Sequence, residues 1–371
     1  MSHNLLIPFN DPKRKFSQDE KLTSSVADLI VNGPYFHGQE EIAFEESLAS
    51  LVNVSNSMFV SSGTSALYLA VASLELPLGS EVIIAANAGG YASVAVTANG
   101  LIPVYAEIDT EGQLDFDKIE ISKTLKTSAI IITHLFGQMN LSASRIREYC
   151  NSNGLKLIED CAQSIGAKFQ GIPAGSLADI STFSFYPTKN LSSFGDSGAV
   201  GTSSPQLYMG LKARREYGWV ERYDAEFSNG GNYRGDELHA LTLNRQLKLL
   251  ESQTMRRKQI WESYKSSINS TDLHLIGSSD ESFVAHLAVL KVIDRNTFRS
   301  FLRSRGIETS VHYPYPDYKQ KAFTRFQGDP LVVTEEFVSK IVSIPLFPEL
   351  EDVEIDHICN VLKEYQQVNN G

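Results

Sequence analysis

The sequence predicts an α/β fold: a large domain built on a mostly parallel sheet with helices on both faces, followed by a smaller α+β domain. From about residue 41 to 201, short and continuously apolar runs alternate with helix-like stretches. Strands that are apolar throughout are typical of a parallel sheet covered on both faces. After residue 231 this alternation stops. The length of 371 residues also favours two domains, expected at 1–245 and 246–371.

The order of the expected elements follows from the apolar pattern. Strands are expected at 58–61, 82–85, 102–108, 129–134 and 155–159, with further candidates at 180–185 and 198–201. Helices are expected between them, at 64–74, 91–99 and 141–150. The second part is predicted to hold one long helix at 236–266, strands around 283–290 and 308–313, and helices at 297–305 and 352–366.

The composition narrows the class of protein. The net charge of −11 opposes binding to nucleic acid or to an anionic membrane, since both attract clustered lysine and arginine. The N-terminal residues have no signal-peptide pattern, and no apolar run approaches the roughly 18 residues of a membrane span. The three cysteines form no CxxC pair, which is typical of reduced thiols in the cytoplasm. The eight histidines have no metal-binding spacing, so no metal is expected.

One aspartate and one lysine each follow a buried strand of the predicted sheet. Asp160 comes directly after the strand at 155–159, and Lys189 lies just beyond the strand at 180–185. Ligands of parallel sheets bind beyond the carboxyl ends of the strands. Pyridoxal 5′-phosphate needs an amine that condenses with its aldehyde and an acid against its pyridine nitrogen. Taken singly, Lys189 also fits a surface loop and Asp160 a helix cap; together they favour a pyridoxal-phosphate site.

Small polar residues at the same predicted sheet edge are candidates for holding the phosphate. Gly63, Thr64 and Ser65 open a helix after a strand, and free N–H groups at a helix start bind phosphate. A plain N-cap explains this turn equally simply. Ser184 offers a further hydroxyl, and Gln163 reaches either the cofactor or a backbone group of its own loop.

These motifs, with others in the same order, resemble nucleotide-sugar aminotransferases of the DegT/DnrJ family, which are fold-type-I pyridoxal-phosphate enzymes. The resemblance covers nearly the whole chain. Its blocks lie at 32–38, 62–67, 79–83, 134–138, 158–163, 183–191, 231–238, 311–314 and 344–348. A GxSxG elbow and a glycine-rich dinucleotide fingerprint are both missing, which disfavours hydrolase and nicotinamide chemistry.

The resemblance implies a role for each candidate residue. Lys189 would bind the cofactor covalently, Asp160 would pair with its ring nitrogen, and Gln163 would face its 3′-hydroxyl. The phosphate ligands that the resemblance implies are Gly63, Thr64, Ser65 and Ser184. It also implies a homodimer in which Asn232 reaches the phosphate of the neighbouring subunit's cofactor.

Two departures from the family pattern stand out. The family usually places an aromatic ring after a threonine, stacked on the cofactor, where this chain reads Ala88-Gly-Gly90. The nearest ring is Tyr91, which either reaches back to stack or leaves the cofactor held differently. The usual Gly-Asp-Gly-Gly after the lysine is Gly195-Asp-Ser-Gly198. One branch of the family carries histidine in place of the lysine and performs dehydration, so the presence of Lys189 favours transamination.

The expected substrates are a nucleotide-linked keto-deoxysugar and an amino donor, glutamate by resemblance. The segments 217–223 and 312–316 look more like members that aminate C3 of the sugar than C4. His312 and Tyr313 are then candidate sugar contacts, although a strand leading into a proline-rich turn explains them as well. The alternatives are a non-catalytic or regulatory member of the family, or another fold-type-I reaction such as that of a desulfurase or aldolase.

Overall fold

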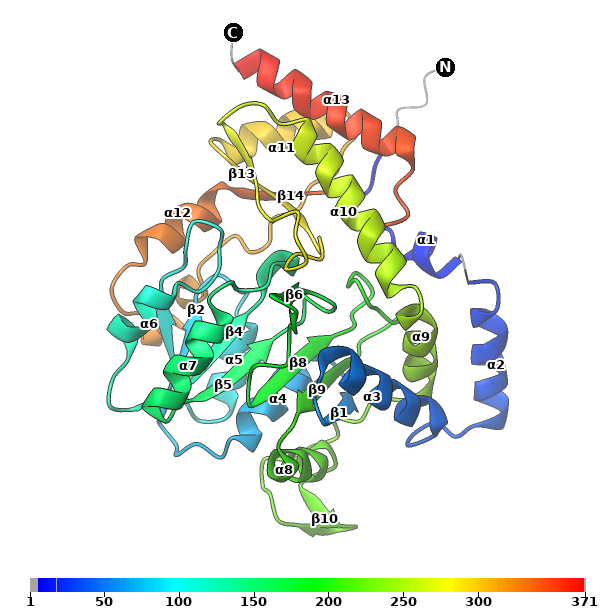
Figure 1. Ribbon diagram of the computed structural model, residues 1–371, viewed down its shortest axis with the longest axis vertical. Coiled ribbons are helices and arrows are strands. Elements are labelled where there is room, and N and C mark those ends of the chain that lie inside the picture. Colours follow the sequence, from blue (N-terminus) through cyan, green and yellow to red (C-terminus); the bar gives the residue numbers. More distant parts are fainter. Residues whose placement is uncertain (1–5, 18, 370–371) are drawn as a thin grey trace.

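The computed structural model describes residues 6–17 and 19–369, and its centre is a seven-stranded sheet (Figure 1). The strand order is β1-β9-β8-β5-β4-β2-β3. Only β9 runs antiparallel to its neighbours in this sheet; the other pairings are parallel. The strands are β1 (Asn56–Val60), β2 (Glu81–Ala85), β3 (Ile102–Ala106), β4 (Thr127–Thr133), β5 (Lys156–Asp160), β8 (Ile180–Ser184) and β9 (Gly198–Thr202).

Helices cover both faces of this sheet because its strands are apolar on both sides. In β2, for example, Ile83 packs into one buried cluster, whereas Val82 and Ile84 pack into the other. The helices on the first face are α3 (Gln39–Val52), α6 (Phe116–Ser122), α7 (Ala143–Asn153) and α9 (Glu237–Leu247). Those on the second face are α4 (Gly63–Ser73), α5 (Tyr91–Ala98) and α8 (Pro205–Arg215). The predicted α/β fold class is confirmed.

The C-terminal part has a core of its own around a three-stranded antiparallel sheet. The sheet consists of β12 (Leu273–Leu275), β13 (Ala288–Val292) and β14 (Ile341–Ile344), and its helices are α10 (Leu250–Ser266), α11 (Arg295–Ser304), α12 (Val332–Lys340) and α13 (Asp352–Asn369). Ile7 packs into this second core and bridges to Ile307. The division at residues 245 and 246 stays a prediction.

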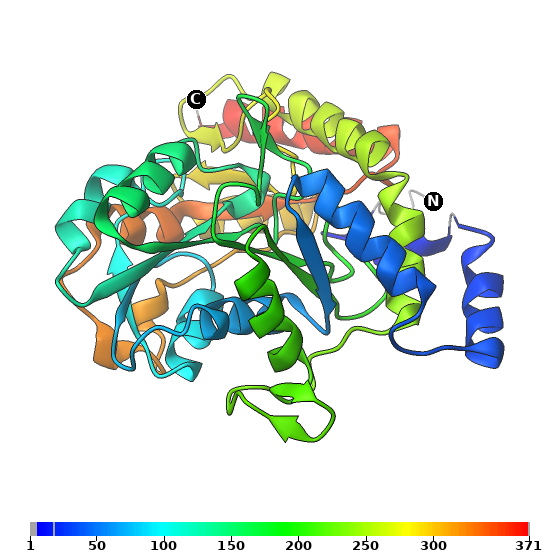
Figure 2. The ribbon, with the colours of Figure 1, turned by 60° about the horizontal axis from the view of Figure 1, so that its bottom comes forward.

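Short elements complete the chain. They are α1 (Pro12–Ser17), α2 (Leu22–Asn32), the 3₁₀ turns η1 (Leu135–Gly137), η2 (Asp317–Lys319) and η3 (Thr324–Phe326), and the hairpins β6 (Lys168–Phe169) with β7 (Ile172–Pro173) and β10 (Trp219–Glu221) with β11 (Asp224–Ala225). Figure 2 shows the β10/β11 hairpin projecting from the body beyond α8. Among the described residues, no helix combines the length and apolar character needed to span a bilayer.

Three predicted elements differ from the structure. The helix expected at 236–266 is two helices, because α9 packs in the first core and α10 in the second. Of the strand expected around 283–290, only the part from Ala288 onward is a strand; Val284 instead donates its N–H to Gly137 O at 2.9 Å. The strand expected at 308–313 reduces to a single bridge between Ser310 and Ser343, which exchange both of their backbone hydrogen bonds.

Candidate active site

Asp160 is the last residue of β5, at the carboxyl end of the parallel strands. It pairs with Thr133 of β4 on one side and Thr182 of β8 on the other. Its side chain is buried, with Oδ1 accepting from the Ala162 N–H at 3.1 Å and Oδ2 accepting from Thr133 Oγ1 at 3.5 Å. Burial raises the pKa of Asp160, while the N–H of Ala162 and the amine of Lys189 act in the opposite direction. A cationic ring nitrogen at this carboxylate would offset the cost of burying its charge.

Lys189 lies in the turn after β8, half-buried, with its backbone N–H donated to Tyr186 O at 2.8 Å. Burial lowers the pKa of Lys189 to about 8, and the nearby charge of Asp160 opposes this shift. The amine is therefore far more available as a nucleophile near neutral pH than an ordinary lysine. The structure brings Lys189 and Asp160 to the same end of the sheet, as predicted.

The turn that carries Lys189 is held by a residue that the sequence reasoning missed. Lys15 of α1 is buried, and its ammonium donates to Ser192 Oγ at 2.7 Å, Asn190 O at 3.1 Å and Lys189 O at 3.3 Å. These contacts use all three protons of the ammonium. Burial lowers the pKa of Lys15 to about 7. No sequence motif links Lys15 to residues more than 170 positions away.

A second clamp reaches the same turn from the C-terminal part. The Asn190 side chain donates from Nδ2 to Val284 O at 2.8 Å, and its Oδ1 lies 3.0 Å from Nδ1 of the buried His286. Burial and the neighbouring cations, Lys189 first among them, keep the pKa of His286 well below its usual range. A neutral His286 with its proton on Nδ1 therefore donates to Asn190.

The candidate phosphate site is the start of α4. Ser62 caps this helix by accepting the Ser65 N–H at 3.0 Å, so the plain N-cap reading of the turn is confirmed. The first N–H groups of any helix nevertheless lack partners within it, and here they belong to Gly63 and Thr64. A Cβ on Gly63 would lie 2.6 Å from the Ser184 Cβ, so the Ser184 side chain stands directly beside this helix start.

The Gln163 side chain forms two hydrogen bonds within the protein. Its Oε1 accepts the Phe136 N–H at 2.6 Å, and its Nε2 donates to the Tyr313 hydroxyl at 3.2 Å. The backbone contact that the sequence left open is therefore present. The amide carries two N–H groups, so one remains for a cofactor hydroxyl.

His312 and Tyr313 reach this sheet edge from the C-terminal part. The His312 Nδ1 lies 2.9 Å from Ser343 Oγ, and burial together with the charge of Lys189 lowers the pKa of His312 to about 4. Tyr91 is 48% exposed, and its ring stands edge-on to Tyr313 at a centroid distance of 6.0 Å. The sequence predicted that Tyr313 lies at the site, but not that its hydroxyl accepts a hydrogen bond from Gln163.

Asn232 lies farther along the edge, exposed, in the segment beside β1. Its backbone bridges to Glu216, and its Oδ1 accepts from Arg234 Nε at 3.1 Å. The next residue, Tyr233, accepts the Ser61 N–H at 2.8 Å. The segment therefore runs close to the helix start of the phosphate site, while the role of Asn232 across a dimer stays a prediction.

Behind Asp160, His134, Glu159 and Cys161 cluster closely enough to suggest a metal site. The donor atoms of His134 and Glu159 already have protein partners. His134 accepts the Asn140 N–H on Nδ1 at 3.0 Å and so donates from Nε2 to Glu159 at 2.9 Å. The Glu159 carboxylate also accepts three backbone N–H groups, from Gly175, Leu177 and Ala178. These contacts tie the 175–178 loop to β5.

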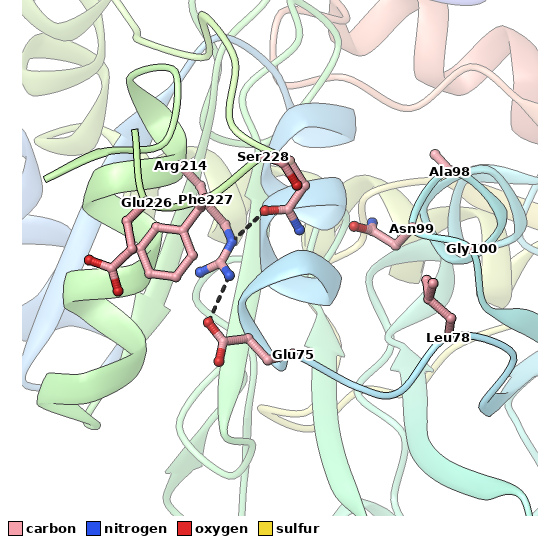
Figure 3. Close-up of a pocket in the computed structure, with 10 residues that line it drawn as sticks. Glu75, Leu78, Ala98, Asn99, Gly100, Arg214, Glu226, Phe227 and Ser228 are labelled. Carbon is pink, nitrogen blue, oxygen red and sulfur yellow. Dashed lines mark hydrogen bonds and ion pairs between the residues drawn. The ribbon is translucent and has the colours of Figure 1, made fainter. Parts of the chain in front are cut away.

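A separate hollow of about 530 Å³ lies between α4, α5 and the segment after β11 (Figure 3). Its central cation is Arg214, which is 3% exposed. Arg214 donates to Glu75 at 2.8 Å, and its Cζ lies 3.9 Å from the centroid of the Phe227 ring. Figure 3 marks the bond to Glu75 and shows the ring beside the guanidinium. Neither Lys189 nor Asp160 lines this hollow, and its arginine already donates to Asn229, Gly210 and Glu75.

Comparison with known proteins shows the family of the chain. The model of the DegT/DnrJ/EryC1/StrS aminotransferase family matches residues 17–363. The chain belongs to this family. Its similarity to dTDP-3-amino-3,6-dideoxy-alpha-D-galactopyranose transaminase from Aneurinibacillus thermoaerophilus is 34% identity, covering 97% of this chain and 99% of the relative.

Two solved structures of similar proteins extend the comparison to the fold and the cofactor. DesV from S. venezuelae, in complex with a ketimine intermediate, has a TM-score of 0.93 and 32% identity, covering 97% of this chain and 98% of that one. NtdA from Bacillus subtilis, with bound cofactor PMP, has a TM-score of 0.91 and 28% identity, covering 98% and 85%. This family member is a pyridoxal-phosphate-dependent aminotransferase, and Lys189, Asp160 and the start of α4 fit that cofactor.

Proposed function

We propose that this aminotransferase places an amino group on C3 of a nucleotide-linked keto-deoxysugar, with glutamate as the amino donor. The observation that carries the sugar site is that His312 feels the charge of Lys189 and Tyr313 the charge of Asp160, so all four groups face one site. A relative with 34% identity, named for a 3-amino-3,6-dideoxy sugar, supports C3 over C4.

In this proposal each residue has a distinct task. Pyridoxal phosphate, when bound, supplies an electron sink for the carbon that loses its proton. Lys189 takes that proton and returns it, and a pKa of about 8 lets the amine do both near neutral pH,. Asp160 holds negative charge toward the ring nitrogen. Gly63, Thr64, Ser65 and Ser184 receive the phosphate through N–H and hydroxyl groups.

His312 is assigned to the sugar as an uncharged group. With its pKa lowered to about 4, the imidazole is neutral throughout the physiological range. It therefore offers one hydrogen bond to a sugar hydroxyl or carbonyl and adds no positive charge beside Lys189. This is consistent with a site that must keep the lysine amine partly neutral.

A substrate panel tests the proposed reaction. The purified protein is incubated with glutamate and with dTDP- or UDP-linked sugars that carry the keto group at C3 or at C4, and the products are identified by mass spectrometry and NMR. We expect amination of a 3-keto sugar and formation of 2-oxoglutarate. Amination confined to 4-keto sugars would contradict the assignment to C3, and no change of cofactor absorbance with glutamate would contradict the donor.

We also propose a homodimer in which Asn232 completes the neighbouring subunit's site. Equal amounts of the inactive variants Lys189→Ala and Asn232→Ala are unfolded, mixed and refolded together. If the sites are shared, random pairing restores about a quarter of the native sites. If each site lies within one chain, mixing restores none, and that result would contradict the proposal.

A cytoplasmic location completes the proposal. Cys150, Cys161 and Cys359 are buried and unpaired in the described part of the chain, which suits a reducing compartment. Cell fractionation tests the location: recovery with cytoplasmic markers is expected, and recovery with exported proteins would contradict it.

A further inference from the structure

The turn between β2 and α5 leaves a gap beside the active site. Gly89 and Gly90 both have positive φ, +79° and +82°, and neither carries a side chain into the site. The next residue, Tyr91, is exposed. Neither glycine can therefore cover a bound cofactor on this side.

The ring of Tyr313 fills this gap. A Cβ on Gly89 would lie 2.6 Å from both Cδ1 and Cε1 of Tyr313, a distance that real side chains do not tolerate. The absence of a side chain at Gly89 is thus what allows the phenol ring to lie against the turn. The Tyr313 ring belongs to the C-terminal part, yet it packs on the first residues after β2.

The hydroxyl of Tyr313 links its ring to the residues around the cofactor. It accepts from Gln163 Nε2 at 3.2 Å, and Gln163 is fixed in turn by the Phe136 N–H at 2.6 Å. Burial raises the pKa of Tyr313, and the charges of Tyr91 and Asp160 act in the same direction. The ring therefore lies between the Gly89 turn and the Asp160 end of β5.

Asp317 anchors the loop that carries this ring. Its backbone N–H donates to Ala86 O at 2.7 Å, and its fully buried carboxylate accepts from Ser93 Oγ at 3.0 Å. Ala86 directly follows β2, and Ser93 lies in the first turn of α5. The loop at 312–317 is thus pinned on both sides of Gly89 and Gly90, which fixes the Tyr313 ring against this turn.

We propose that Tyr313, rather than Tyr91, supplies the aromatic ring that stacks on the pyridine ring of the bound cofactor. Tyr313 is then a cofactor-contacting residue, and the Gly89-Gly90 turn is the space that admits it. The inference rests on the pyridoxal-phosphate site and is independent of which sugar is aminated.

The test measures cofactor binding without the covalent bond to Lys189. Cofactor-free protein is titrated with pyridoxamine 5′-phosphate, which has no aldehyde, by isothermal calorimetry. For Tyr313→Leu we expect the Kd to rise about three- to tenfold, the range of one aromatic contact. Tyr313→Phe keeps the ring and should stay within about twofold of the wild type, and Tyr91→Leu should behave likewise.

The outcomes separate the competing roles. An unchanged Kd in Tyr313→Leu, or a larger rise in Tyr91→Leu, would overturn the proposal. An unchanged Kd combined with a raised KM for the nucleotide sugar would make Tyr313 a sugar contact only. If Tyr313→Leu does not fold, Gly89→Ala replaces it, because the added Cβ displaces the ring; a folded Gly89→Ala protein with native affinity would also overturn the proposal. Amination of an unexpected sugar would leave all of these Kd values unaffected.

Discussion

The sheet edge and the 312–317 loop contribute to one active site in different ways. Asp160 is the last residue of β5 and is placed by its ladder neighbours, and Lys189 lies in the turn that β8 leads into, closed by its own N–H on Tyr186 O. The loop is held by partners far along the chain, such as Ser93, which is 224 positions from Asp317. The strands of the sheet place both reacting groups at one edge, whereas the turn around Lys189 and the groups that enclose the site are held by contacts between distant segments.

The largest expected effect comes from removing the reacting group of the sheet edge. Lys189→Ala should lower transamination by about a thousandfold or more, because both the covalent attachment and the proton carrier are lost. The absorbance of the lysine-linked cofactor near the visible edge should disappear. Lys212→Ala, which removes an exposed lysine on α8, is the control. Retained absorbance in Lys189→Ala would show that Lys189 does not hold the cofactor and that the sheet edge does not carry the chemistry.

The second effect concerns the acid at the same edge. Asp160→Asn keeps the shape of the side chain but removes its charge, and kcat should fall by about a hundredfold. Steady-state kinetics with glutamate and a keto sugar measure this. A loss below about threefold would mean that the ring nitrogen is held by some other group.

The pH dependence of cofactor attachment tests whether the pKa of Lys189 is lowered. With a pKa lowered to about 8, the neutral amine becomes available as pH rises through that value. The rate at which cofactor-free protein forms the lysine linkage should therefore increase with a midpoint near pH 8. Because Asp160 raises the pKa of Lys189, the midpoint in Asp160→Asn should move to lower pH. A wild-type midpoint near 10.5, the usual lysine value, would contradict a buried amine.

A smaller effect is expected from the long-range clamp on the lysine turn. Lys15→Met leaves the carbonyls of Lys189 and Asn190 and the Ser192 hydroxyl without their donor, which should cost about 1–3 kcal/mol of unfolding free energy. The folded pKa of Lys15 is lowered to about 7 from 10.5. Between these values the unfolded chain binds more protons, so this group makes stability rise with pH, and Lys15→Met should reduce that rise.

Urea unfolding at pH 7 and at pH 9.5 measures both the stability loss and its pH dependence. Lys13→Met, on the exposed side of the same helix α1, is the matched control and should change neither value. Equal stability losses in the two variants would show that the clamp on the turn contributes nothing.

The sequence predicted the strands of the large sheet and the ends where Asp160 and Lys189 lie, because continuous apolar runs and the turns after them are local signals. It also predicted the helix start at Gly63 for the same reason. The sequence did not predict the break between α9 and α10, because that break depends on each helix packing in a different core. It took 308–313 for a strand, and it missed Lys15, because both depend on contacts between distant segments.

Chemical trapping tests directly whether the Lys189 amine bonds to the cofactor. The holoenzyme is reduced with borohydride, digested, and the peptide that carries the reduced cofactor is sequenced by mass spectrometry. The label should lie on Lys189. A label on Lys15, the buried lysine that donates to this turn, or on any further lysine with Lys189 unmodified, would contradict this assignment.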